Sequence, residues 1–308
     1  MALTCIDLFA GLGGFSEGAR QAGATVLWAA NHWPLAVELH AANHPEADHA
    51  CQDLQQANFG RVPDCDVVLA SPCCQGHTKA KGKEKPGSDA SRATAWAVTA
   101  AVEAKKPRAV IVENVEEFTD WICYPAWRAS LECQGYRLTE VLVDAADLGV
   151  PQHRTRVIVF GVRTGAPLMV EQPKTAHMPF ATVADLSAGK WSPVEKRGRA
   201  EKTLRRVERG RREFGPTFVM PYYSGGSGLT GRSLARPLGT VTTRDRWALV
   251  DGDMMRMLRV DEYRAAMGFH AGYQLPKNRA DAIMALGNAI CPAVAAWAVK
   301  TVREHIGA

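Results

Sequence analysis

Short apolar runs alternate with helix-like stretches over the first half of the chain. The apolar runs, typical of buried strands, lie at residues 3–8, 25–30, 66–70, 109–112, 138–143 and 157–162. Apolar residues at helical spacing lie between several of them, at residues 14–21, 34–43, 90–104 and 125–133. Strands that alternate with helices favour a mostly parallel sheet with helices on both faces, so we expect an α/β fold.

This regularity is lost in the middle of the chain. Residues 164–235 are rich in Pro, Gly and Arg, show little periodicity and include the flexible run Ser224–Gly228. Helical spacing returns at residues 261–267 and 280–304. The middle segment is therefore expected to differ in architecture from what surrounds it.

The length of the chain fits this division. Its 308 residues, 46% of them apolar, can bury one full core and the core of a smaller lobe. We expect a large domain over residues 1–167, a small irregular lobe over 168–235, and a return to the large domain over 236–308.

Composition also indicates the compartment. No apolar run has the length of a membrane span, and the N-terminus lacks the layout of a signal peptide. We expect a soluble cytoplasmic protein, a monomer without a membrane partner. The eight cysteines include no C-x-x-C pair, so we expect reduced thiols and no metal site.

Positive charge is concentrated in one segment. Residues 190–213 contain ten Lys or Arg and four Glu, a net charge of +6, while the whole chain carries +5, so the remainder sums to −1. A basic segment on a nearly neutral body suggests contact with a polyanion. The alternative is a solvated helix face with Glu–Arg pairs, such as Glu201 with Arg205 and Glu208 with Arg212.

A glycine-rich turn, Asp7-Leu-Phe-Ala-Gly-Leu-Gly-Gly14, follows the first apolar run and opens the first helix. Its glycines allow a tight turn and close approach to a ligand, so it predicts a nucleotide-like cofactor at the strand ends. Its spacing is not that of a phosphate-binding G-x-x-x-x-G-K loop, and the second strand ends at Asn31 without an acidic residue. Both facts weigh against ATP and NAD, and a tight turn with no ligand is the alternative.

A cysteine pair follows another strand. Ser71-Pro-Cys-Cys-Gln-Gly-His-Thr78 comes directly after residues 66–70, at the strand end where parallel sheets place their active sites. A thiolate there could act as a nucleophile, whereas most thiols in folded proteins are buried and inert. The polar loop around the pair favours the nucleophile.

Charged residues stand beside two further strands. Glu113 follows residues 109–112, where a carboxylate could transfer protons or simply begin a helix. Arg154 and Arg156 alternate along an extended segment, so both would face one side and suit a phosphate or a planar acceptor. Two surface arginines at the start of a strand are the alternative.

Taken in this order, these features resemble the bacterial and phage DNA (cytosine-5)-methyltransferase family. The resemblance covers residues 7–161 and 236–297 and includes D-L-F-A-G-L-G-G, the P-C-C-Q loop, E-N-V, Q-H-R-T-R and G-N-A-I-C-P. The ordered set is far more specific than any one member. It implies a Rossmann-like methyltransferase sheet, S-adenosyl-L-methionine as cofactor, double-stranded DNA as substrate, and a target-recognition role for residues 168–235.

The family's roles are carried over residue by residue. The resemblance implies that Cys74 attacks C6 of cytosine and that Glu113 protonates or hydrogen-bonds N3. It further implies that Arg156, supported by Arg154, holds O2 of a base flipped out of the duplex. The implied cofactor-binding residues are Phe9, Gly11, Leu12, Gly13, Asn31, Asp53, Pro72 and Asn288.

Two positions depart from the family. Members normally have Pro before the cysteine, where this chain has Cys73. Matching residues 75–78 to those after the family's nucleophile selects Cys74, whereas pairing Pro72 with Cys73 would require an insertion. Asn31 stands where members usually have an acid for the cofactor ribose. Weaker cofactor binding is one interpretation, and use of an analogue with an extra carboxylate is the other.

Further segments bear on the substrate. The lysine-rich residues 79–85 resemble the family's mobile loop over DNA, or form a solvated surface loop. The basic segment and Phe214–Tyr223 could contact phosphates and a groove. An RNA-directed enzyme and a catalytically silent DNA-binding homologue are the rival functions. The basic lobe favours DNA, and the retained Cys74 and Glu113 argue against a silent homologue.

Overall fold

The computed structural model describes residues 2–77, 87–163, 165–222 and 231–308. Several positions singled out above lie outside this described part: Thr78, residues 79–85, Tyr223 and the run Ser224–Gly228.

The chain forms two compact units whose boundaries differ from those we expected. The first consists of Met1–Asp144, Thr155–Lys174 and Ala289–Ala308, and the second of Ala145–Arg154 and Thr175–Asn288. The chain therefore returns to the first unit only at Ala289, instead of at residue 236. A short segment before the strand at residues 155–162 also belongs to the second unit.

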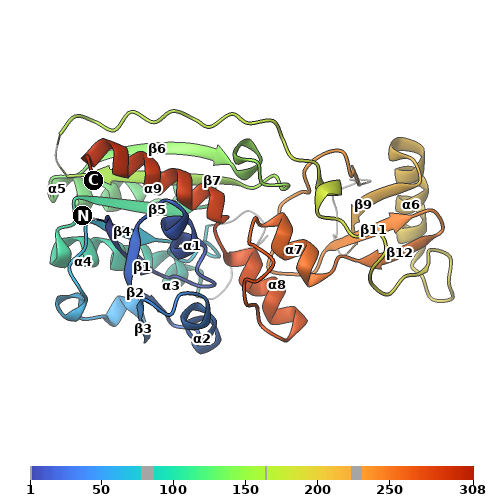
Figure 1. Ribbon diagram of the computed structural model, residues 1–308, viewed down its shortest axis with the longest axis horizontal. Coiled ribbons are helices and arrows are strands. Elements are labelled where there is room, and N and C mark those ends of the chain that lie inside the picture. The colour runs from blue at the N-terminus through green and yellow to red at the C-terminus, as the bar shows by residue number, and fades with distance from the viewer. Residues whose placement is uncertain (1, 78–86, 164, 223–230) are drawn as a thin grey trace. The chain divides into compact units, whose positions relative to one another are not determined.

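A seven-stranded sheet with the order β3-β2-β1-β4-β5-β7-β6 forms the centre of the first unit (Figure 1). Its strands are β1 (Thr4–Leu8), β2 (Thr25–Asn31), β3 (Asp48–Cys51), β4 (Val67–Ala70), β5 (Ala109–Asn114), β6 (Arg137–Asp144) and β7 (Thr155–Val162). The strands β1 to β5 are mutually parallel, and β7 is antiparallel to both β5 and β6. The prediction of a mostly parallel α/β sheet is confirmed.

Helices cover both faces of this sheet (Figure 1). They are α1 (Gly14–Gln21), α2 (Pro34–Asn43), α3 (Ser88–Ala93), α4 (Ala95–Lys105), α5 (Tyr124–Cys133) and α9 (Pro292–Ile306). On one face α1 packs on α9, and Trp297 of α9 meets Phe160 of β7 with ring centroids 5.7 Å apart. On the other face Val68 shares a buried cluster with Val98 of α4 and Trp127 of α5.

Three elements of this unit differ from their prediction, each for a local reason. The expected helix 90–104 is divided at Thr94 into α3 and α4. The expected helix 280–304 is divided into α8 (Arg279–Asn288) and α9, because Pro292 has no N–H to donate and keeps Cys291 extended. The strand β3 was missed because its sequence, D-H-A-C, lacks an apolar run.

The second unit contains an antiparallel sheet with the order β10-β9-β11-β12-β8. Its elements are β8 (Ser192–Pro193), α6 (Glu201–Phe214), β9 (Thr217–Pro221), β10 (Arg232–Ser233), β11 (Trp247–Asp251), β12 (Met254–Met257), α7 (Val260–Ala266) and α8. The expectation of an irregular lobe is therefore wrong. Two of these strands have only two residues and α6 is mostly charged, so neither kind of element gives a strong apolar period.

The C-terminal stretch Arg279–Ile306 has the length and the apolar composition that a membrane span requires, contrary to our expectation that no such run exists. In the structure, 78% of its most apolar window is buried inside the protein. Core helices have the same composition for this reason.

The contact of α1 with α9 provides a test of the packing. A Cβ atom on Gly18 would lie 2.4 Å from the Cβ of Ala295 and 2.6 Å from the backbone nitrogen of Ala296. We expect Gly18→Ala to lower the free energy of unfolding by about 1–3 kcal/mol, because the helices must move apart. Urea denaturation measures this. Gly272→Ala is the control, since its Cβ would lie at an ordinary 3.5 Å from His270, and equal losses in both variants would contradict the close packing.

Candidate functional site

The carboxyl ends of the parallel strands meet at one edge of the first unit's sheet, where such folds bind their ligands. Strand register sets Leu8, Ala70 and Val112 side by side on β1, β4 and β5. Because β7 runs in the opposite direction, its beginning lies at this edge. The edge therefore gathers the glycine-rich turn, the cysteine loop, Glu113 and Arg156.

The turn from β1 to α1 has a left-handed backbone. The angle φ is +61° at Phe9, +54° at Gly11 and +92° at Gly13. A left-handed conformation is uncommon for a bulky side chain, and strain of this kind concentrates at ligand sites. The three residues predicted to hold the cofactor thus form one strained turn at the sheet edge.

Two neighbours in this turn face the interior of the first unit. The side chain of Leu12 is only 2% exposed, so the protein core surrounds it. A Cβ atom on Gly14 would lie 2.2 Å from the carbonyl oxygen of Ile290, a distance that no side chain tolerates. Glycine is therefore required at Gly14 for packing at the start of α1.

Asp7 contributes a fully buried carboxylate at the end of β1. Its Oδ2 accepts a hydrogen bond from the Ser16 hydroxyl at 2.7 Å, while Oδ1 has no hydrogen-bond partner within the described chain. Burial raises the pKa of this carboxyl to about 7. A buried polar atom without a partner is unusual, and a polar ligand at the edge would explain it.

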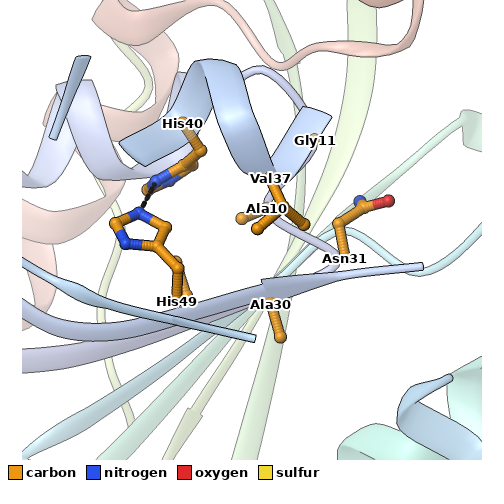
Figure 2. A pocket seen from close by; sticks show the side chains of 8 residues that line it. Ala10, Gly11, Ala30, Asn31, Val37, His40 and His49 are labelled. Atoms are coloured by element: carbon orange, nitrogen blue, oxygen red, sulfur yellow. Dashed lines mark hydrogen bonds between the residues drawn. The ribbon is translucent and has the colours of Figure 1, made fainter. Parts of the chain in front are cut away.

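A chain of hydrogen bonds continues from Ser16 to two histidines. His40 Nε2 lies 3.0 Å from Ser16 Oγ. His40 Nδ1 lies 2.8 Å from His49 Nε2, and Figure 2 marks this second hydrogen bond with a dashed line. Since the Ser16 hydroxyl donates to Asp7, it accepts from His40 Nε2–H, and His40 Nδ1 then accepts from His49. Burial lowers the pKa of His40 to about 3, so this ring is neutral at pH 7.

The same histidines line a small, open pocket, whose empty volume of about 140 Å³ includes space open to solvent (Figure 2). Its lining residues are Ala10, Gly11, Ala29, Ala30, Asn31, Val37, His40 and His49. Pockets that enclose drug-sized ligands measure roughly 300–1,000 Å³, so this one is too small to enclose a nucleoside cofactor. Gly11 and Asn31, two of the residues predicted to bind the cofactor, are part of this lining.

Asn31 ends β2 and Asp53 follows β3, and a side-chain oxygen of each accepts a hydrogen bond from a backbone N–H two residues later. Asn31 Oδ1 accepts a hydrogen bond from the backbone N–H of Trp33 at 2.9 Å, just before α2. Its amide NH₂ is therefore the group suited to a ligand. Asp53 is exposed, and its Oδ1 accepts from the backbone N–H of Gln55 at 3.0 Å. These donors and acceptors, with the unpartnered oxygen of Asp7, fit a polar nucleoside cofactor.

Cys74 lies in the loop that follows β4. The loop turns at His77, whose backbone N–H donates to the carbonyl of Cys74 at 2.9 Å, and the Cys74 side chain is partly exposed. By contrast, burial raises the pKa of the Cys5 thiol and raises that of Cys65 to about 12. Those two thiols are poor nucleophiles because they seldom ionise.

The end of β5 contacts this loop and β7. The side-chain amide of Asn114 donates to the carbonyl of Pro72 at 3.1 Å, which ties the loop to the sheet. Glu113 Oε1 lies 2.9 Å from Arg156 Nε, and the two side chains are 7% and 12% exposed. Arg156 also donates to the carbonyl of Thr155 at 2.7 Å. A partly exposed thiol, a buried carboxylate and a guanidinium thus share one sheet edge.

Arg154 has different partners from Arg156. Its guanidinium donates to the carbonyls of Val241 at 3.0 Å and Gly287 at 2.9 Å, all within the second unit. The strand β7 begins at Thr155, so its alternation does not reach Arg154, and the expectation that both arginines face one acceptor stays a prediction. Asn288 is the last residue of α8 in the second unit, and its cofactor role stays a prediction.

Sequence reasoning missed several residues of this site. Ser16, His40 and His49 join the buried Asp7, and Ser91 and Thr94 contact the cysteine loop. Isolated hydroxyl and imidazole side chains form no sequence motif, so no local signal could have identified them. Among the described residues, no group of three or more His, Cys, Asp or Glu is arranged to hold a metal ion.

The raised pKa of Asp7 predicts a pH effect. The folded chain keeps this proton up to about pH 7, whereas the unfolded chain loses it near pH 4, so wild-type stability falls between these values. Relative to wild type, the free energy of unfolding of Asp7→Asn should therefore rise by about 3 kcal/mol from pH 5 to pH 8. Urea titrations at both pH values measure this. The exposed Asp53→Asn is the control, and a pH-independent difference for Asp7→Asn would contradict the prediction.

Comparison with known proteins agrees with this geometry. The model of the family described as C-5 cytosine-specific DNA methylase matches residues 3–304. The Type II methyltransferase M.NlaX of Neisseria lactamica is 26% identical over 98% of this chain and 96% of its own length. M.AgeI of Thalassovita gelatinovora, also a Type II methyltransferase, is 32% identical over 56% of this chain, a match that spans only 42% of that relative.

A solved structure shares the fold. The methyltransferase EhMeth of Entamoeba histolytica superposes with a TM-score of 0.71 over 99% of both chains at 15% identity. At this identity the likeness concerns the fold alone, whereas the family model covers nearly the whole sequence. The chain therefore belongs to the family of C-5 cytosine-specific DNA methylases, and this membership implies a methyl donor of the S-adenosylmethionine type.

Proposed function

We propose that this protein transfers a methyl group from S-adenosyl-L-methionine to C5 of cytosine in double-stranded DNA. The observation that carries the proposal is the shared sheet edge of the partly exposed Cys74 and the buried ion pair between Glu113 and Arg156. A nucleophile and a proton donor for one ring must lie near each other, and this edge supplies both. Membership of the family supports the same reaction.

The chemistry follows from these side chains. The thiolate of Cys74 forms a bond to C6, and the electron pair of the C5–C6 double bond moves through the ring toward N3, where Glu113 delivers a proton. Carbon 5 is then nucleophilic. When bound, S-adenosylmethionine supplies an electrophilic methyl group. Return of the N3 proton to Glu113, loss of the C5 proton to a water molecule of the solvent and cleavage of the C6–S bond restore the aromatic ring and the thiolate. Arg156 holds Glu113 in place and would bind O2 of the ring.

The cofactor is assigned to the glycine-rich turn and the neighbouring strand ends. The left-handed turn at Phe9, Gly11 and Gly13 and the unpartnered oxygen of Asp7 support this assignment. Asp53 would accept from the adenine amino group. Asn31 would donate its amide NH₂ to the ribose, because its oxygen already accepts a hydrogen bond from the backbone N–H of Trp33. A ribose donor in place of an acid is the feature that distinguishes this site.

The helix α6 is proposed to contact DNA phosphates. Four exposed basic residues lie along one face of this helix: Lys202, Arg205, Arg209 and Arg212. They are spaced by three, four and three residues, so they cover about 15 Å along one face. The opposite face packs through Gly210 against the ring of Phe218. Arg205 pairs with Glu201, as the solvated-helix alternative expected. A stripe of cations beside a packed face suits a sugar–phosphate backbone.

Modification of DNA in cells tests the proposal. DNA from cells that express the chain should contain 5-methylcytosine at one recurrent sequence by bisulfite sequencing, and mass spectrometry should show a methyl group rather than a carboxymethyl group. Cys74→Ala should abolish the modification, because it removes the attacking sulfur, whereas Cys73→Ala should retain measurable activity. Loss of activity only in Cys73→Ala would reverse the assignment. Modified tRNA with unmodified DNA would identify an RNA-directed enzyme.

The salt dependence of binding tests the role of α6. We expect the triple variant Lys202→Ala, Arg209→Ala, Arg212→Ala to bind duplex DNA more weakly. Each lost phosphate contact should lower the slope of log affinity against log salt by about 0.9. Fluorescence anisotropy at several salt concentrations measures the slope. Lys300→Ala, an exposed cation on α9, is the matched control. The same slope in the triple variant and wild type would exclude phosphate contacts by α6.

A further inference from the structure

Four hydrogen bonds connect the cysteine loop to α3 and the residue after it. The Ser91 hydroxyl donates to Cys73 Sγ at 2.9 Å and accepts from the backbone N–H of Gly76 at 3.1 Å. The backbone N–H of Cys73 donates to Thr94 Oγ1 at 3.0 Å. Arg92 Nη1 donates to the carbonyl of Gly76 at 3.0 Å. Cys74 therefore lies between two anchored residues, Cys73 before it and Gly76 after it.

The Ser91 hydroxyl makes hydrogen bonds on both sides of Cys74. Ser91 has one proton, which it gives to the sulfur of Cys73, and its oxygen accepts from the far side of the loop. Thr94 Oγ1 in turn donates to the carbonyl of Ser91 at 2.8 Å, so its remaining lone pair is directed to the N–H of Cys73. The proton of each hydroxyl thus has one acceptor, so the donor and acceptor roles of Ser91 and Thr94 are both defined.

The loop is also in van der Waals contact with α3. A Cβ atom on Gly76 would lie 2.5 Å from the carbonyl oxygen of Ser88 and 2.8 Å from Cγ of Arg92. Only glycine allows this approach. The backbone of the loop is therefore held on the side of α3, both by close packing and by hydrogen bonds. None of these hydrogen bonds is made by the thiol of Cys74.

We infer that Ser91 and Thr94 are positioning residues, which hold Cys74 in its attacking geometry through Cys73 and Gly76. This inference rests on the proposed function, in which the sulfur of Cys74 must meet C6 at bonding distance. A displacement of about 1 Å at a reacting atom can cost up to 100-fold in rate, so a loop that carries a nucleophile needs anchors on both sides. Of the two adjacent cysteines, Cys73 anchors the loop, because its sulfur accepts a hydrogen bond from the Ser91 hydroxyl.

Adduct formation separates positioning from cofactor binding. The measurement is the rate at which Cys74 forms a covalent adduct with a duplex that carries 5-fluorocytosine at the sequence found by bisulfite sequencing. Ser91→Ala and Thr94→Val should each slow this rate by about tenfold, with the KM for S-adenosylmethionine within about twofold of wild type. Ser91→Thr and Thr94→Ser keep the hydroxyls and should recover most of the rate. Thr99→Ala is the control, since it removes the hydroxyl that bonds Ser130 on the next helix.

A double-mutant cycle tests the route through Cys73. Cys73→Ala removes the sulfur acceptor, so it should slow the adduct rate less than Ser91→Ala does, and the double variant should be no slower than Ser91→Ala alone. Fully additive effects would show that Ser91 does not act through Cys73. Wild-type rates in Ser91→Ala, or an equal loss in Thr99→Ala, would also overturn the inference.

Hydrogen exchange keeps the test independent of the reaction. If the wild type neither methylates DNA nor forms the adduct, the proposed function fails. The anchors are then judged by amide protection, because the N–H groups of Cys73 and Gly76 bond to Thr94 and Ser91. Protection of Gly76 should fall by about tenfold in Ser91→Ala, and that of Cys73 by a similar factor in Thr94→Val. Unchanged protection would refute the anchors themselves.

Discussion

The strand β7 runs antiparallel to β5, and this reversal brings the beginning of one strand to the end of the other. Arg156 follows the first residue of β7 and Glu113 precedes the last residue of β5, so their side chains meet as a buried ion pair at the edge where the parallel strands end. With a parallel β7, Arg156 would lie at the opposite edge, and the carboxylate would be left without its cation. A buried carboxylate without a partner is costly, so the direction of β7 is what makes Glu113 tolerable there.

The remaining parts of the site depend on the same edge. Asn114, next to Glu113, ties the cysteine loop to β5 through Pro72, while Ser91 and Thr94 hold the loop from α3. The loop of Cys74, the proposed nucleophile, is therefore restrained from two directions by groups that have no part in the proposed reaction. Catalysis by a cysteine loop requires this, because a mobile thiolate reaches its target carbon only in a small fraction of encounters.

The part of the edge proposed to bind the cofactor contains a buried carboxyl group in a chain of hydrogen bonds instead of an ion pair. Asp7 is buried with one oxygen unpartnered, and a chain of hydrogen bonds through Ser16 leads from it to His40 and His49. The protonation of Asp7, which is connected to the buried His40 and through it to the partly exposed His49, is governed by burial and by hydrogen bonds together. A polar ligand at the glycine-rich turn would satisfy the free oxygen, and binding of such a ligand would then be coupled to the protonation of Asp7.

Local signals in the sequence determined the sheet strands with apolar runs, the bounds of α1 and α2, and the order of the motifs at the strand ends. Apolar periodicity, Gly and Pro are read from neighbouring residues, which is why these features could be predicted. Tertiary structure alone decided the partner of Arg156, the commitment of Arg154 to two backbone carbonyls, and the bonds from Ser91 and Thr94 to the cysteine loop. It also decided that the second unit is an ordered sheet. Each of these depends on contacts between residues distant in the chain, and the geometry of such contacts cannot be deduced from any short segment of the sequence.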